Sequence, residues 1–413
     1  MENNKIIKMG IGFATGRKSF QQVLRTYIYN WKECGLTDND GVHLNLFVAY
    51  DLKYSETKPS DYTNVHDELL NLIDDACFIG STAIQKEIET LAKEDIITKK
   101  EAQKIFGGGY AGQRNAVVYF AIKNKMDYLV FLDDDEYPLA VTKTRDTAIW
   151  SGQHVLNTHL KYIADADITH GHHCGYISPI PYIQFDDTLT ERDFRTFIEA
   201  ISNDIISWDS IRTVMRNGGV TYADTDILIN NAPKEVKEVN GTKFVSGANL
   251  CLNLTDPERV NAFYNPPDAR GEDTFLSTTL NKRKVLKVPC YTFHDGFSAY
   301  NHLLDGVLPI ELKHVHADAP KIIERFYRAC IGWIRYKPLL LYITQRDDYR
   351  CKIEEMEDKL SRVLPNICSF FKRGDFMNIS TELEYYNKNA SKHFDEFLET
   401  QDIWGRLCQY LSA

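Results

Sequence analysis

Four consecutive acids, Asp133, Asp134, Asp135 and Glu136, directly follow the apolar run 128–132. The run predicts a buried strand, which would place several carboxylates side by side at the carboxyl end of that strand. Two carboxylates about 4 Å apart repel by roughly 1 kcal/mol even in water, so the cluster needs a compensating cation. Mg²⁺ or Mn²⁺ fits, because these ions prefer oxygen ligands and accompany phosphates. The alternative is a solvated acidic turn.

A second acidic pair, Glu272 and Asp273, stands at the start of segment 271–276, which is predicted to begin a helix. Acids at such a position commonly only complement the helix dipole. A sugar hydroxyl that attacks an activated anomeric carbon, however, needs a carboxylate to take its proton on the side opposite the leaving diphosphate. A metal at the first cluster would neutralise the charge that builds up on the leaving phosphates. We therefore expect this pair to be catalytic.

A glycine-rich segment, 107–112, matches G-x-G-x-x-G, and Asp133 follows it by about twenty residues, as in a dinucleotide-binding fingerprint. That fingerprint needs a strand directly before the glycines, whereas residues 99–106 are charged and helix-prone. A nicotinamide-dependent oxidoreductase is therefore a lesser alternative. The glycines of segment 12–19 have the wrong spacing for a Walker loop.

The elements that must position these acids follow an alternating pattern in the first 140 residues. Apolar runs predict strands at 6–13 and 44–50, and helical spacing predicts helices at 18–31, 66–75, 82–91 and 113–124. Strand, helix and strand in this order predict a parallel pair with a right-handed crossover. We expect an α/β nucleotide-binding half that ends in the acidic cluster.

The character of the chain changes near residue 317. Residues 141–243 show no clear pattern, whereas Asp318-Ala319-Pro320 predicts a helix start with Asp318 as the capping acid, and helical patterns then continue almost to the end. We expect a catalytic domain at 1–317 and a helical domain at 318–413.

The order of these motifs resembles the nucleotide-sugar glycosyltransferases of the A-type fold, and most closely the inverting, family-2-like enzymes. The resemblance covers roughly residues 5–300. It is carried by Arg114-Asn115, the strand that ends in Asp133–Asp135, segment 246–250 (SGANL) and segment 271–277 (GEDTFLS). It implies a Rossmann-like α/β catalytic domain that transfers a sugar from a UDP- or GDP-sugar to a carbohydrate or other hydroxyl acceptor.

The resemblance also implies roles for individual residues. Asp133 and Asp135 would form the D-x-D motif that holds Mn²⁺ or Mg²⁺ on the donor diphosphate, and Asp273, beside Glu272, would be the base. The residues expected to face the nucleotide are Asp51, Arg114, Asp133, Asp134 and Gly247. The Q-x-x-R-W element and membrane helices of the processive synthases are absent from the sequence, which favours a non-processive enzyme.

Three alternatives stay open beside this interpretation. A retaining mechanism is compatible with the same fold. A sugar-nucleotide-forming nucleotidyltransferase would carry a basic, glycine-rich loop after the first strand, and segment 12–18 resembles such a loop weakly. A sugar-binding protein with a dead active site is disfavoured by the intact acids at both positions.

Histidines supply a further signal. His294 ends a short apolar run 21 residues after Asp273, and several enzymes of this fold complete the metal shell with a histidine in that region. We expect His294 to be the third metal ligand, with His302, His314 and His316 as competitors. A compact cluster contains His170, His172, His173 and Cys174. We favour acceptor binding or a structural role for this cluster over zinc, because no distant partner ligands accompany it.

Composition limits the remaining classes. The 413 residues include 48 Lys and Arg against 58 Asp and Glu, a net charge of −10 that argues against a general nucleic-acid binder. Nine scattered cysteines without C-x-x-C, and an N-terminus without a signal-peptide pattern, favour a cytoplasmic protein with reduced thiols. No apolar run is long enough to span a membrane. Segment 322–343 mixes basic and aromatic residues, so we expect it to pack on the catalytic domain or on a second subunit, with peripheral contact to anionic lipid as an alternative.

Overall fold

A curved mixed sheet organises the chain in the computed structural model, which describes residues 6–202, 207–300, 303 and 305–413. Within these residues nine strands form the sheet in the order β3-β2-β1-β4-β10-β8-β11-β5, with β9 paired to β11. The strands are β1 (Ile7–Thr15), β2 (Val42–Tyr50), β3 (Asp75–Ile79), β4 (Tyr128–Phe131), β5 (Glu136–Tyr137), β8 (Ile168–Gly175), β9 (Lys234–Glu235), β10 (Leu250–Asn253) and β11 (Val285–His294). The fold is therefore mixed α/β and compatible with nucleotide binding.

The first four strands of this order are parallel, and their connections reverse direction at β1. Ile11 of β1 lies opposite Leu46 of β2 on one side and Val130 of β4 on the other. The chain thus moves outward from β1 to β2 and β3 and then returns to the opposite side of β1 with β4. Ligands of open α/β sheets bind at the carboxyl ends of strands at such a reversal. Here those ends are Thr15 and the acids after Phe131.

Side chains alternate between two apolar layers, one on each face of the sheet. Met9, Ile11 and Phe13 face the layer formed by α1 (Phe20–Glu33), α2 (Ser60–Thr63), α3 (Asp67–Leu70), α7 (Val155–Ile163) and the hairpin of β6 (Leu139–Thr144) and β7 (Thr147–Gly152). Leu129 and Phe131 face the opposite layer. That layer contains α4 (Ser81–Lys93), α5 (Lys99–Phe106), α6 (Tyr110–Lys123), α11 (Glu272–Ser277) and α15 (Ala390–Ser412).

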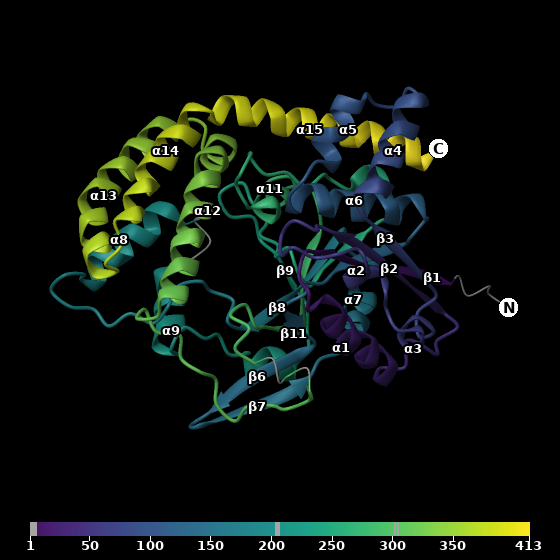
Figure 1. Ribbon diagram of the computed structural model, residues 1–413, viewed down its shortest axis with the longest axis horizontal. Helices are drawn as coiled ribbons and strands as arrows, with labels where there is room; N and C mark the ends of the chain where they lie inside the picture. The colour runs from purple at the N-terminus through teal and green to yellow at the C-terminus, as the bar shows by residue number, and fades with distance from the viewer. Residues whose placement is uncertain (1–5, 203–206, 301–302, 304) are drawn as a thin grey trace.

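A separate helical core lies beside the sheet, at the left of Figure 1. It is built by α8 (Glu191–Ile201), α9 (Trp208–Arg216), α12 (Pro320–Thr344), α13 (Tyr349–Phe370), η3 (Gly374–Met377) and α14 (Asn378–Lys388). Two of these helices, α8 and α9, come from the middle of the chain, where the sequence shows no clear pattern. The short helices α10 (Thr225–Asn230) and η1 (Pro257–Arg259) lie outside this core.

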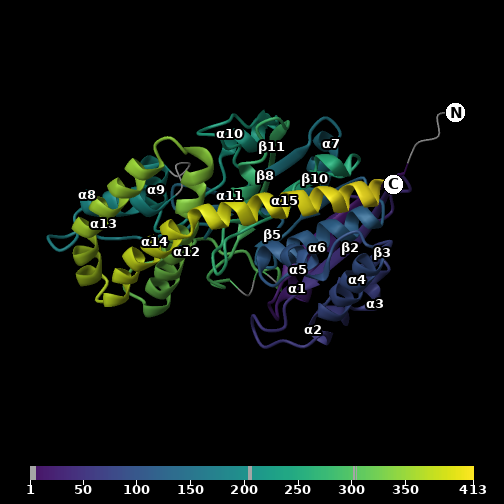
Figure 2. The same ribbon diagram turned by 90° about the horizontal axis from the view of Figure 1, so that it is seen from above.

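The last helix, α15, leaves the helical core and runs back along the sheet domain, over α5 and α6 (Figure 2). Trp404 is 2% exposed, and its indole N–H donates to the carbonyl oxygen of Val260 at 2.9 Å. Arg406 pairs with Glu101 of α5 at 2.5 Å. The C-terminal helices are thus fixed to the nucleotide-binding half by both apolar and charged contacts.

Two local predictions are wrong. The helix predicted at 66–75 is only the four-residue α3, and it is followed by β3, which the pattern did not indicate. β3 is an edge strand with one fully buried side chain, Ile79, so its sequence carries a weak apolar signal. The N-cap of α12 is Ala319 and not Asp318, although Pro320 does occupy the first turn. No helix in the described part of the chain is long and apolar enough to cross a membrane.

Candidate functional site

The acidic segment lies between β4 and β5 and is tied to the end of β1. The hydroxyl of Thr15 donates to the carboxylate of Asp134, a residue only 7% exposed. The Arg17 guanidinium pairs with Asp135 and lies 3.5 Å from Asp134. Burial would raise the pKa of Asp135, but His294 and Arg17 hold it well below its usual range. The sequence indicated the acids and the basic segment 12–18, but not the pairing of Arg17 with Asp135, because these residues are 118 positions apart.

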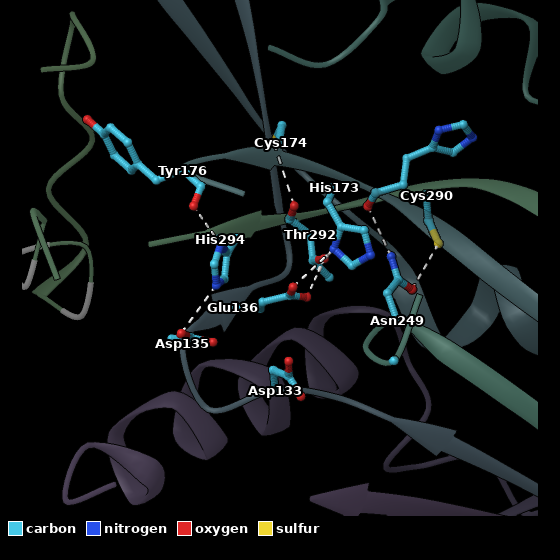
Figure 3. Close-up of polar contacts among 12 residues, drawn as sticks. Asp133, Asp135, Glu136, His173, Cys174, Tyr176, Asn249, Cys290, Thr292 and His294 are labelled. Atoms are coloured by element: carbon cyan, nitrogen blue, oxygen red, sulfur yellow. Dashed lines mark hydrogen bonds and ion pairs between the residues drawn. The ribbon is translucent and has the colours of Figure 1, made fainter. Parts of the chain in front are cut away.

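His294, at the end of β11, faces Asp135 across the β5–β11 pair (Figure 3). Its Nε2 lies 3.2 Å from Asp135 Oδ2, and its Nδ1 donates to the carbonyl oxygen of Tyr176 at 2.8 Å. Burial lowers the pKa of His294, yet the neighbouring Asp135 carboxylate more than offsets this effect and raises the pKa to about 9. The carbonyl fixes the proton on Nδ1, so Nε2 is the atom directed at the acidic segment.

The side-chain atoms near His294 fit a divalent metal ion in part. Asp135 Oδ2 and His294 Nε2 are 3.2 Å apart, the separation expected for two ligands that each lie about 2.1 Å from one shared ion. Asp133 belongs to the same segment, but its carboxylate faces Arg114 at 3.4 Å. Within the described ranges no three His, Cys, Asp or Glu side chains form a preassembled metal site. Asp135 and His294, two side chains of types that bind divalent ions, thus lie next to each other at this edge of the sheet.

Arg114, on α6, connects the two acidic groups. Its side chain is 4% exposed and packs against the rings of Phe131 and Phe263, whose centroids lie 5.0 and 5.6 Å from Cζ. Its Nη1 donates to the carbonyl oxygen of Gly247 at 2.5 Å. Its Nη2 and Nε lie 3.4 Å from Asp133 and 3.5 Å from Glu272. One buried cation therefore contacts three segments, of which the one at Asp133 precedes the other two, at Gly247 and Glu272, by more than 100 residues.

Asp273, in the first turn of α11, is held by backbone donors. The N–H of Gly247 donates to Oδ2 at 3.2 Å, and the N–H of Thr274 donates to Oδ1 at 2.8 Å. Burial and the charge of Glu272 raise the pKa of Asp273 to about 6, although Arg114 and the two N–H groups act in the opposite direction. A carboxylate with this pKa is ionised at neutral pH and close to the range in which a general base works well.

Burial is also the largest influence on the pKa of Asp133. It raises the pKa of this carboxyl to about 7, against the opposing effect of Arg114 and with help from Glu136, Asp135 and Asp134. Arg114, 3.4 Å away, offsets only part of this effect. Basic side chains also lie beside the other acids of the segment, so the compensating metal ion stays a prediction.

Asp51 follows β2 at the same sheet edge. Its N–H donates to the carbonyl oxygen of Thr15 at 2.9 Å, and its carboxylate accepts from the N–H of Lys53 at 2.8 Å. Tyr54 lies nearby, edge to face with Tyr110 at 6.4 Å, and Arg270 covers the Tyr110 ring at 5.6 Å. The sequence did not indicate these aromatic and basic side chains, because they come from three different loops and helix ends.

The side chains of the histidine cluster on β8 do not converge on one site. His173 lies 3.0 Å from Glu136, which also accepts from the Thr292 hydroxyl at 2.6 Å (Figure 3). His172 stacks on Tyr291 at 5.0 Å, whereas His170 and Cys174 are buried, with exposures of 2% and 0%. Only His173 belongs to the acidic site. Of the competing histidines, His314 and His316 are exposed and neighbour each other, and His302 lies outside the described residues.

An open cavity of about 930 Å³ borders the acidic segment. Its lining includes Arg17, Lys18, Gln21, Asp134, Asp135, Tyr137, Asp295, Ser298 and Asp305. The volume suits a ligand the size of a nucleotide sugar. The glycine-rich segment 107–112 does not follow a strand, since helix α5 precedes it, and this context disagrees with a dinucleotide fingerprint.

Comparisons with known proteins give little to set beside this geometry. No family model matches the sequence, and no curated protein matches it. Among solved structures, the apo form of mouse xyloside xylosyltransferase 1 is similar with a TM-score of 0.21 and 11% sequence identity, over 47% of this chain. The chain matches 58% of the length of that enzyme.

Proposed function

We propose that the chain is a glycosyltransferase that uses a nucleotide-diphosphate sugar and a divalent cation and inverts the anomeric centre. The observation that carries the proposal is the pair of acidic groups on either side of Arg114. One group, Asp135 with His294, has the ligand types of a metal site, and the other, Asp273, has the pKa of a general base. Their position at the reversal of the parallel strands supports a nucleotide as the ligand.

In the proposed reaction Asp273 takes the proton of the acceptor hydroxyl. The hydroxyl oxygen forms a bond to the anomeric carbon of the donor, and the bond from that carbon to the diphosphate breaks with its electron pair on the phosphate oxygen. A single displacement of this kind inverts the configuration. Gly247 and Thr274 orient the base through their N–H groups, and Arg114 links Gly247 to the acidic segment through its contacts with the Gly247 carbonyl oxygen and Asp133.

Asp135 and His294 would hold the cation, with Asp133 as the further carboxylate of the segment. A bound Mn²⁺ or Mg²⁺ supplies positive charge that stabilises the leaving diphosphate. Asp51, Tyr54 and Tyr110 are proposed to face the nucleoside, because they lie at the same edge on the β2 side of β1. The acceptor would be a carbohydrate or another hydroxyl compound.

A nucleotidyltransferase is the second candidate, and one observation favours it. Arg17 and Lys18, in the loop after β1, line the cavity beside Asp134 and Asp135, as a basic activation loop would. Such an enzyme would join a nucleoside triphosphate to a sugar phosphate and release pyrophosphate. It would not need Asp273 as a base toward a sugar hydroxyl.

Product analysis with a panel of UDP-, GDP- and CDP-sugars and Mn²⁺ tests the proposal. We expect release of the nucleoside diphosphate, either by transfer to an added acceptor or by slow hydrolysis, and an inverted anomeric proton signal in NMR. Exchange of labelled pyrophosphate into a nucleoside triphosphate, without diphosphate release from any nucleotide sugar, would favour the nucleotidyltransferase. Retained configuration would contradict the single displacement.

A further inference from the structure

Arg325 of α12 is a basic side chain at the acidic site that lacks an acidic partner. Its guanidinium stacks on the ring of Phe297, with Cζ 4.1 Å from the ring centroid. Among the described residues it makes no ion pair and no hydrogen bond, although it is half-buried. Its neighbour on the same helix, Arg328, pairs with Glu324 at 2.5 Å and is 76% exposed.

The position of Arg325 is set by a glycine beside the proposed metal ligand. A Cβ atom at Gly296 would overlap Nη2 of Arg325 and would lie 2.6 Å from Cε1 of His294. The two side chains therefore rest against the same residue. Since Gly296 has no side chain, the guanidinium can reach the edge of the site from a helix that begins more than 20 residues later.

The charges around Arg325 compensate it only in part. Burial lowers the pKa of Arg325, and the positive charges of Arg17 and Arg270 act in the same direction, against the carboxylates of Asp135 and Asp295. Asp135 is already paired with Arg17 and His294. A half-buried cation that makes no ion pair has lost part of its hydration, and an anionic ligand would offset that loss.

We propose that Arg325 binds the diphosphate group of the donor, which makes helix α12 part of the catalytic site. The planar guanidinium, held over the ring of Phe297, presents its N–H groups in one plane, the geometry that suits two phosphate oxygens. The neighbouring His294 would place the cation on the same diphosphate. This assignment rests on the proposed function, because it takes the site to hold a nucleotide diphosphate.

Binding of inorganic pyrophosphate, measured by calorimetry in Mn²⁺, tests the assignment without knowledge of the base or the sugar. Arg325→Met keeps the stem on Phe297 and removes the charge, so we expect pyrophosphate to bind about 10- to 100-fold more weakly. Arg325→Lys, which keeps the charge but not the planar fork, should lose less. Arg328→Met removes a charge from the same helix away from the site and should bind like the parent.

Equal affinity of Arg325→Met and the parent, or no binding to the parent, would overturn the assignment. Should Arg325→Met fail to fold, Arg325→Lys replaces it: weaker pyrophosphate binding than in the parent supports the assignment, and equal binding overturns it. An excess of the nucleoside diphosphate should displace pyrophosphate, and simultaneous binding of both would show that the anion site does not belong to the donor. Pyrophosphate binding that depends on Arg325, without turnover of any nucleotide sugar, would refute only the proposed function.

Discussion

Replacement of Asp273 by Asn should remove the general base and preserve the surrounding structure. The amide has nearly the same volume, and its oxygen can still accept from the N–H of Gly247, which lies 3.2 Å from the carboxylate, while the bond from the N–H of Thr274 to the other oxygen is lost. An amide cannot take a proton from a hydroxyl group. We expect the rate of transfer to fall by about two to four orders of magnitude, the usual contribution of acid–base catalysis. Donor binding should survive, since the proposed metal ligands lie on the other side of Arg114.

The pH dependence gives a second measure of the same group. The pKa of Asp273 is about 6, so kcat/KM should rise with pH up to about that value and then level off. At pH 5 the ionised fraction would be roughly a tenth, and the rate should fall accordingly. The assay is the initial rate of nucleoside diphosphate release between pH 4.5 and 8 at saturating Mn²⁺.

Glu272→Gln separates Asp273 from other groups that titrate nearby. The charge of Glu272 raises the pKa of Asp273, so its removal makes ionisation easier and should move the acidic limb to lower pH. The main influences on the pKa of Asp133 are burial, Arg114 and the other acids of its own segment. A near-normal rate in Asp273→Asn, or an acidic limb that stays in place in Glu272→Gln, would refute the reasoning.

Two further perturbations test the metal ligand and the C-terminal helix. His294→Ala should weaken Mn²⁺ binding at least about tenfold in a protein that stays folded. His316→Ala, at an exposed histidine, should bind like the parent, and equal affinities in the two variants would move the ligand role elsewhere. Trp404→Ala should lower the free energy of unfolding by about 3–5 kcal/mol in a denaturant titration, because it empties a buried site and removes the bond to Val260. The control is Leu398→Ala on the same helix, where the side chain is 49% exposed, and it should change the free energy of unfolding by less than about 0.5 kcal/mol. A loss in Leu398→Ala as large as in Trp404→Ala would contradict the packing of α15 on the sheet domain.

The parallel half of the sheet could be predicted because its signals are local. β1, β2 and β4 are apolar runs bounded by polar residues, and their order in the chain implies their direction. The acids after β4 could then be placed at one sheet edge without knowledge of tertiary contacts. The structure confirms this placement, and it brings Asp133 within 3.4 Å of Arg114.

The rest of the sheet and of the site depends on contacts between residues far apart in the sequence, and local sequence patterns do not indicate such contacts. β8 carries three histidines and two glycines, so it does not resemble a strand, although it lies in the middle of the sheet between β10 and β11. The helical spacing of 322–343 indicates a helix, but which of its basic residues reaches the site is decided by how α12 packs. Arg325 lies beside His294 because its guanidinium packs over the ring of Phe297 and Gly296 has no side chain in its way.

Binding of nucleotide sugars in the presence and absence of metal tests the central claim most directly. Calorimetric titration of UDP- and GDP-sugars into the protein should show binding with Mn²⁺ that is lost in EDTA. Asp135→Asn should lose most of the metal dependence, whereas Asp305→Asn, which changes another acid of the same cavity, should keep it. Equal affinity in Mn²⁺ and in EDTA, or an unchanged metal dependence in Asp135→Asn, would contradict the proposal that this edge of the sheet holds a cation and a nucleotide diphosphate.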